Sequence, residues 1–233
     1  MSAARRFYKS AAAVEAEGGF GVALDERRLR TPGGAHFVAP TRALAEACAA
    51  EWGAQGEHIV PASMPITQLA FAAIDWTAQS REQRAEYVVS YAHTDLCCHR
   101  AEAPVELVAR QASAWDPLVG WGAETLGAQL PVVTGVIAAD VAPAALAALR
   151  KAAAGLDDFR LTALSQAAGL TGSALIGFAL VEGKIEARQA FAAAALDDLW
   201  GLEHWGEDAE ARARLERVRA ELDVLGRFIG ALA

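Results

Sequence analysis

Residues 31–52 read TPGGAHFVAPTRALAEACAAEW, and within them the hydrophobic pattern of the chain changes. The opening Thr-Pro-Gly-Gly is typical of a tight turn. Ten residues later Thr41 is a good helix N-cap. After it, apolar residues recur at spacings of about three to four: Leu44, Ala45, Cys48 and Trp52. This stretch therefore predicts that a strand-rich segment gives way to a helix at Thr41.

Upstream of residue 41, short apolar or β-branched pieces alternate with turn residues such as Glu17-Gly18-Gly19 and Asp25-Glu26. We expect four of these pieces to form a small antiparallel sheet: 7–15, 20–24, 27–30 and 36–38. So few short strands need a helix or a second layer for stability. Residues 1–40 are therefore predicted to be a β-rich N-terminal domain that packs against another part of the protein.

Downstream, helical spacing continues almost to the end of the chain. Beyond Pro143 we expect five helices: 144–154, 157–169, 172–180, 185–202 and 208–232. The Val- and Ile-rich segment 130–139 fits either a further strand or an extended crossing segment. The predicted fold class is α+β, in which residues 41–233 form a larger α-helical C-terminal domain.

Composition bounds the functions that such a chain can perform. Its 233 residues are 54% hydrophobic and 21% charged, enough apolar material for an ordered core. The net charge of -8 argues against nucleic acid and anionic lipid as partners, because both attract clustered positive charge. Three cysteines, two of them adjacent, indicate a reducing compartment. With neither a secretory signal nor an apolar run of about 20 residues, we expect a cytoplasmic protein without membrane insertion.

The strongest candidate for chemistry is His93-Thr-Asp-Leu-Cys-Cys-His99, which concentrates possible metal ligands. His93 and Cys97 could share a helix face, but Cys98 and His99 would then turn away from it by about 100° each. The alternative is a helix terminus that Thr94 or Asp95 caps, with two buried thiols. A metal-binding protein or enzyme centred on His93, Cys97 and His99 is therefore our second hypothesis. The sequence has no nucleophile elbow, P-loop or dinucleotide fingerprint.

Three patches combine acidic and aromatic residues: Glu51-Trp52, Trp115-Asp116-Pro117 and residues 196–208, LDDLWGLEHWGED. Trp52 and Trp115 are expected to fill core gaps. In 196–208 adjacent carboxylates diverge on a helix, which does not suit general acid–base catalysis of one substrate atom. Tryptophans beside charged groups are typical of protein interfaces. The third patch therefore has two interpretations: a partner-binding surface, or tryptophans that fill core gaps beside solvated carboxylates.

These motifs occur in an order that resembles a known family over nearly the full chain: Arg6-Phe-Tyr-Lys9, Glu51-Trp52, Met64-Pro-Ile-Thr67, Tyr91-Ala-His-Thr-Asp-Leu96, Trp115-Asp-Pro-Leu118 and Glu203-His-Trp-Gly-Glu-Asp208. The chain is similar to the ATP synthase assembly factor 2 family, the chaperones that hold the alpha subunit of the F-type ATP synthase catalytic sector during assembly. The resemblance implies a small N-terminal β domain, a helical C-terminal domain and no catalysis. Two residues depart from the family pattern: Gly201 stands where a polar residue is common, and Cys98-His99 replaces Cys-Tyr.

The resemblance also implies a partner and a site. The partner is the unassembled alpha subunit, which the chaperone shields on its beta-facing surface until the hexamer forms. The residues carried over as alpha-subunit contacts are Asp197, Asp198, Glu203, Trp205 and Asp208. Those expected to be critical for folding are Trp52, Trp115 and Asp116. We expect a monomer without a cofactor, cytoplasmic here and in the mitochondrial matrix for eukaryotic relatives.

Overall fold

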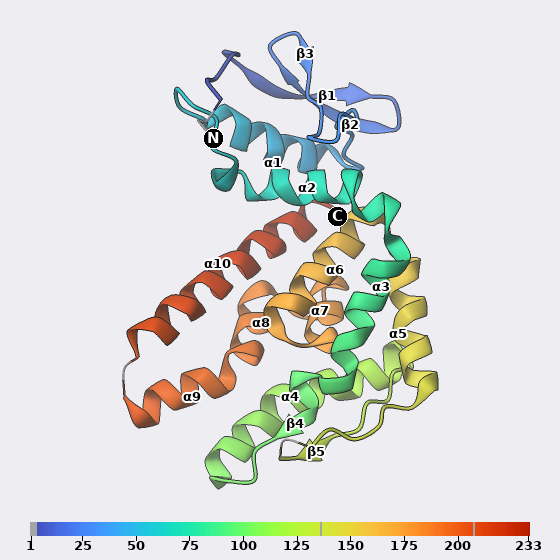
Figure 1. Ribbon diagram of the computed structural model, residues 1–233, viewed down its shortest axis with the longest axis vertical. Coiled ribbons are helices and arrows are strands. Elements are labelled where there is room, and N and C mark those ends of the chain that lie inside the picture. Colours follow the sequence, from blue (N-terminus) through green and yellow to red (C-terminus); the bar gives the residue numbers. More distant parts are fainter. Residues whose placement is uncertain (1–3, 136, 207) are drawn as a thin grey trace. The chain divides into compact units, whose positions relative to one another are not determined.

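The structure is a computed structural model, and it describes residues 4–135, 137–206 and 208–233. Short strands at the N-terminal end precede a long succession of helices (Figure 1). The predicted fold class, a small antiparallel sheet followed by a helical region, is confirmed. Residues 1–3 of the predicted N-terminal domain, Val136 of the segment 130–139 and Glu207 of the segment 196–208 lie outside the described residues.

The N-terminal sheet has the strand order β1-β2-β3, with both pairs antiparallel. Its strands are β1 (Ala11–Ala16), β2 (Gly19–Leu24) and β3 (Arg27–Arg28). The predicted fourth piece, 36–38, is not a strand: around it only isolated bridges form, Phe20 with Ala39 and Arg30 with His36. Gly19 permits this close approach, because a Cβ there would lie 2.2 Å from the carbonyl oxygen of Ala39.

Helix α1 (Arg42–Gly53) begins where the sequence predicts, and the Thr41 hydroxyl accepts a hydrogen bond from Leu44 N at 3.2 Å. This helix lies against β1 and β2 (Figure 1). After α1 the chain passes through a short 3-10 turn, η1 (Pro61–Ser63). Helix α2 (Pro65–Asp75) follows and leads into a second 3-10 turn, η2 (Thr77–Gln79).

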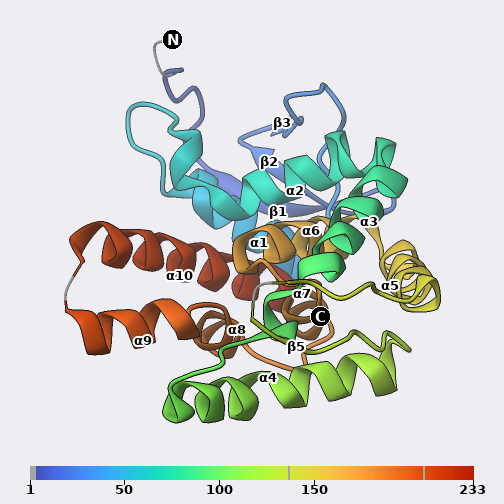
Figure 2. The same ribbon diagram turned by 60° about the horizontal axis from the view of Figure 1, so that its bottom comes forward.

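Most of the remaining described residues are helical, and one pair of very short strands lies among them. The helices are α3 (Arg81–Ser90), α4 (Val105–Thr125), α5 (Pro143–Gly155), α6 (Asp158–Thr171), α7 (Ala174–Val181), α8 (Ala187–Ala194), α9 (Leu196–Trp205) and α10 (Ala209–Gly230). Two 3-10 turns, η3 (Tyr91–Thr94) and η4 (Leu96–Cys98), follow α3. The segment 130–139 contributes β5 (Val133–Thr134), which pairs in parallel with β4 (His99–Arg100). Every residue of α7 is buried, and α4 and α8 pack on it (Figure 2).

One predicted helix, 185–202, is in fact two. The backbone of Ala195, with φ −95° and ψ 7°, ends α8 and α9 starts at the next residue. As a result Asp197 and Asp198 lie in the first turn of a helix, where the positive end of the helix dipole stabilises carboxylates. The break therefore gives the acidic pair a different setting from the helix interior that the sequence predicted.

By its internal contacts the chain divides into two compact units. Unit 1 contains the described residues up to Arg81, together with Asp158–Thr162 and Arg227–Ala233. Unit 2 contains Glu82–Asp157 and Ala163–Gly226. The boundary predicted after residue 40 separates strand from helix rather than one compact unit from another, and it stays a prediction. Across the described residues, none of the helices combines the length and the apolar character that a membrane crossing requires.

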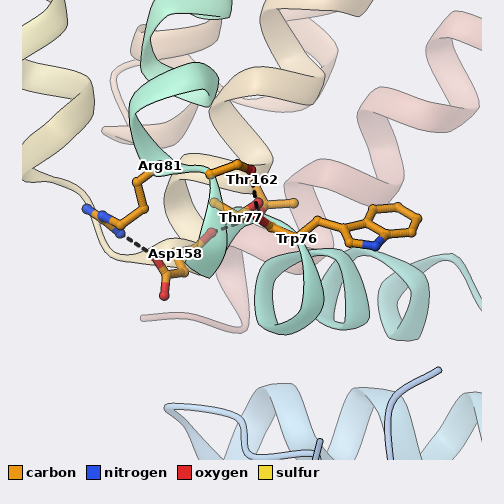
Figure 3. A network of polar contacts seen from close by, with 6 residues as sticks. Trp76, Thr77, Arg81, Asp158 and Thr162 are labelled. Carbon is orange, nitrogen blue, oxygen red and sulfur yellow. Dashed lines mark hydrogen bonds and ion pairs between the residues drawn. The ribbon is translucent and has the colours of Figure 1, made fainter. Parts of the chain in front are cut away.

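Within unit 1 a polar network joins η2 to the first turn of α6, although these segments lie far apart in the sequence (Figure 3). The hydroxyl oxygens of Thr77 and Thr162 are 2.7 Å apart, and the Thr162 hydroxyl donates to the Asp158 carbonyl at 2.7 Å. Thr77 is therefore the donor in the first bond. Arg81 forms an ion pair with the Asp158 carboxylate. Beside this network the ring of Trp76 is 65% exposed.

Candidate partner-binding site

The candidate site is built on α9, which is fixed to unit 2 through the buried ring of Trp200. The guanidinium carbon of Arg110, on α4, lies 4.6 Å from the centre of that ring. The His204 imidazole stacks on the same ring with centroids 3.8 Å apart. His204 Nδ1 also donates to the Trp200 carbonyl at 2.9 Å, which places the ring proton on that nitrogen. The Arg110 cation over the Trp200 ring therefore holds α9 against α4, and the stack with His204 supports that ring from within α9.

The predicted acidic contacts of α9 all have partners within unit 2. Glu203 accepts from Arg110 at 2.8 Å, and Asp198 accepts from Arg214 of α10 at 2.8 Å. Gln111 of α4 donates to Asp197 at 2.8 Å. Both ion pairs are about half exposed, so each contributes at most about 1 kcal/mol and can exchange for a pair with another protein.

Asp208 has a structural role at the start of α10. Its carboxylate accepts from the backbone N–H groups of Glu210 at 2.9 Å and Ala211 at 3.1 Å. These are groups that a helix leaves unpaired at its N-terminus, and a capping side chain satisfies them. Asp208 is exposed, so it remains accessible to a partner while it caps the helix.

Trp205 differs from the acids because it projects into solvent. Its side chain is 84% exposed at the last position of α9. Gly201 lies one turn earlier, and a Cβ added there would be 3.3 Å from the six-membered ring of Trp205. Gly201, the departure from the family pattern noted above, therefore leaves room for the Trp205 ring. A large aromatic side chain exposed to this degree is typical of a binding anchor.

Two of the residues expected to be critical for folding, Trp115 and Asp116, act together with a buried arginine. Trp115 has no exposed surface, and its indole N–H donates to the Ala193 carbonyl of α8 at 2.9 Å. Arg100 is buried over the Trp115 ring and lies 2.8 Å from the exposed Asp116 carboxylate. This arrangement supports a role in folding for both residues, which stays a prediction.

Trp52 lies in unit 1, buried beside Tyr8 with the ring centres 5.8 Å apart. The Tyr8 hydroxyl donates to the Trp52 carbonyl at 2.8 Å. Glu51, the residue before Trp52, accepts hydrogen bonds from the backbone N–H groups of Ile66 at 2.9 Å and Thr67 at 2.7 Å. Glu51 therefore caps the N-terminus of α2, which gives the acidic-aromatic pair Glu51-Trp52 a structural setting.

The metal hypothesis required His93, Cys97 and His99 to converge. The chain bends at Asp95 between two 3-10 turns, so His93 and Cys97 share no helix; His93 is exposed and Cys97 is buried. In the part of the chain that the structure describes, no three His, Cys, Asp or Glu side chains form a group that could hold a metal ion. Burial raises the pKa of the Cys97 thiol well above its usual value and that of Cys98 to about 12. Both thiols are therefore protonated at neutral pH.

Asp95 caps η4, which agrees with the alternative to a metal site, a terminus capped by Thr94 or Asp95. Asp95 also bonds to a segment far away in the sequence. Its buried carboxylate accepts from Cys97 N at 3.0 Å, from the Ser173 hydroxyl at 2.6 Å and from Leu175 N at 3.1 Å. The last two groups belong to the N-terminus of α7, the buried helix of unit 2. Burial raises the pKa of Asp95, and these hydrogen bonds oppose the rise. Asp95 thus ties two segments of unit 2 together.

The sequence did not identify the residues that complete the site: Arg110, Gln111, Trp200, His204 and Arg214. Arg110 and Glu203 are 93 positions apart, and no local spacing reports such a pair. Trp200 and His204 belong to the patch 196–208. Their spacing of four residues is the signal in the sequence that could have predicted their stacking on one face of a helix.

Three comparisons agree on the family of this chain. A family model described as ATP12 chaperone protein matches residues 5–123. A mutant form of P. denitrificans Atp12p is 41% identical, with a TM-score of 0.94 and complete coverage of both chains. Atp12 from Paracoccus denitrificans is 42% identical, with a TM-score of 0.93 and 99% coverage of both. The mitochondrial protein atp12 of Schizosaccharomyces pombe is 26% identical over 219 residues, which cover 88% of this chain and 75% of that protein. The chain belongs to the ATP12 chaperone family.

Proposed function

We propose that this protein, a member of a family of ATP synthase assembly chaperones, binds the unassembled alpha subunit of the F-type ATP synthase catalytic sector. In this proposal it protects the beta-facing surface of that subunit from aggregation in the cytoplasm and leaves as the hexamer forms. It acts by binding alone, without catalysis or a cofactor. The observation that carries the proposal is the exposed Trp205 at the end of α9, in a chain related over its full length to Atp12 proteins.

The surroundings of Trp205 suit a contact that must later be released. The ring supplies apolar area to a partner, since a tryptophan contributes strongly when an interface excludes water around it. Asp198 and Glu203 lie on α9, the helix that ends at Trp205. Each forms a half-exposed ion pair, Asp198 with Arg214 and Glu203 with Arg110. A basic side chain of the alpha subunit can replace either arginine at little net cost. Such a contact is specific and remains displaceable.

The proposal is tested with isolated alpha subunit. Tagged chaperone should co-purify with alpha as a separable complex and suppress its aggregation on dilution from denaturant. Isolated beta subunit is the matched control and should neither be retained nor be protected. Retention of beta but not alpha, or aggregation of alpha at an unchanged rate, would contradict the proposal.

A further inference from the structure

A polar pocket lies in unit 2 and is lined by residues of α3 and α6. These two helices lie away from α9 in the ribbon diagram (Figure 2). The pocket has a volume of about 300 Å³. The lining residues are Arg84, Tyr87, Ser165, Gln166, Gly169 and Leu170. The pocket is lined by more polar than apolar surface, so its chemistry differs from the aromatic anchor described above.

The lining presents hydrogen-bond donors and, in the described chain, no carboxylate. Arg84 is half buried and has no ion-pair partner among the described residues, although the protein carries a net charge of -8. The nearest acids along the chain, Glu82 and Glu86, do not line the pocket. Glu86 is held elsewhere by Arg150, at 2.7 and 3.0 Å. A guanidinium left free beside neutral donors is suited to a carboxylate, which it can bind through two parallel hydrogen bonds.

Tyr87 is the second donor group of the pocket, and its position depends on a glycine. Its hydroxyl oxygen lies 2.8 Å from that of Tyr91. This hydrogen bond is the main cause that raises the pKa of Tyr91 to about 12, so Tyr91 stays protonated. A Cβ on Gly169 would lie 2.9 Å from the Tyr87 hydroxyl oxygen. Glycine within a helix costs about 1 kcal/mol relative to alanine, and here it provides the space that the phenol occupies.

We propose that this pocket binds a carboxylate of a peptide or protein, with Arg84 as the charged partner and Tyr87 and Gln166 as neutral donors. The volume admits a short carboxylate-bearing group and is at the lower end of the range for ligand sites. An acidic side chain and a chain terminus offer the same carboxylate. The experiment therefore separates these two sources.

The test is a titration of the intact protein followed by amide chemical shifts, with three small probes. N-acetylglutamic acid α-amide presents a side-chain carboxylate, N-acetylalanine a terminal carboxylate, and N-acetylalanine amide none. At least one carboxylate probe should produce saturable shifts at residues 84–87 and 165–170, and the neutral probe should not. Whichever carboxylate binds identifies the source, and binding of both supports the shared chemistry.

Three variants make the assignment specific. Arg84→Gln should weaken binding of the carboxylate probe at least fivefold, whereas Arg217→Gln, an exposed arginine of unit 2 outside the pocket, should leave it unchanged. Gly169→Ala should weaken binding without lowering the unfolding midpoint, because alanine favours the helix but displaces the Tyr87 hydroxyl. Absence of saturable shifts with both carboxylates, equal binding of the neutral probe, or unchanged affinity in Arg84→Gln would overturn the proposal. None of these measurements uses the alpha subunit, so their outcome is independent of the proposed function.

Discussion

Unit 2 contains two regions in which the same residue types have opposite surroundings. In its buried interior Trp115 is fully enclosed and bonded to Ala193, and Asp95 accepts three hydrogen bonds from fixed donors. On the α9 surface Trp205 is 84% exposed, and Asp198 shares a half-exposed ion pair with Arg214. Residue type alone therefore does not distinguish a structural acid or tryptophan from one available to a partner. The number of fixed hydrogen-bond or ion-pair partners and the exposed area of the side chain distinguish the two.

The largest expected effect separates the two tryptophans. Trp115→Ala should lower the free energy of unfolding by about 4 kcal/mol, because it removes a large buried side chain and leaves a cavity. Trp205→Ala should change it by less than about 0.5 kcal/mol, because the ring has few contacts to lose. Urea denaturation followed by circular dichroism measures both. Similar losses in the two variants would remove the distinction between the regions.

The acids provide the next comparison. Asp95→Ala should cost about 3 kcal/mol, since it leaves buried N–H and O–H donors without an acceptor. Asp208→Ala removes an exposed helix cap and should cost about 1 kcal/mol. The same denaturation experiment ranks them. An Asp208 variant as unstable as the Asp95 variant would mean that exposure does not decide the cost of losing an acceptor.

The reactivity of the cysteines measures how well the interior of each unit excludes a reagent. Burial raises the pKa of Cys48 to about 12, as it does for Cys98, so the reactive thiolate is scarce at pH 8. Iodoacetamide should therefore label native protein far more slowly than unfolded protein. In Asp95→Ala, peptide mass spectrometry should find faster labelling of Cys97 and Cys98 than of Cys48, which lies in unit 1. Rapid labelling of all three in the native wild type would contradict the buried setting.

Charge reversal on α9 should affect binding more than folding. Asp198→Lys breaks a half-exposed ion pair and should cost about 1 kcal/mol of stability or less. Under the proposed function it should weaken alpha-subunit binding several-fold, and Asp197→Lys should do the same. Glu86→Lys is the matched control, because it breaks the similarly exposed ion pair between Glu86 of α3 and Arg150 of α5. Pull-down with graded alpha concentrations compares the variants, and equal weakening by all three would point to net charge rather than to this surface.

The parts of the fold that the sequence predicted depend on local signals. The start of α1 followed from the Thr41 cap and the spacing after it, and the turns at 17–19 and 25–26 separate the strands that the structure shows. The break at Ala195 could not be predicted, because the alanine-rich stretch before it holds no proline or glycine. Backbone geometry imposed by tertiary packing replaced the continuous helix there.

The candidate site was predicted less completely for the same physical reason. The sequence offered Thr94 or Asp95 as a cap, and in the structure Cys97 N donates to Asp95. Its bonds to Ser173 and Leu175, about 80 positions away, depend on packing that no spacing encodes. Likewise the sequence grouped the acids of 196–208 with Trp205 but could not show that α4 and α10 supply their partners. Exposure, which distinguishes Trp205 from Trp200, required the structure.

The central claim is that Trp205 anchors the alpha subunit, and affinity measurements on a matched pair of variants test it most directly. Trp205→Ala and Trp76→Ala each remove an exposed tryptophan, the first from unit 2 and the second from unit 1. Titration of labelled chaperone with isolated alpha subunit should give at least a tenfold loss of affinity for Trp205→Ala and wild-type affinity for Trp76→Ala. Unchanged affinity in Trp205→Ala, or an equal loss in both variants, would contradict the account.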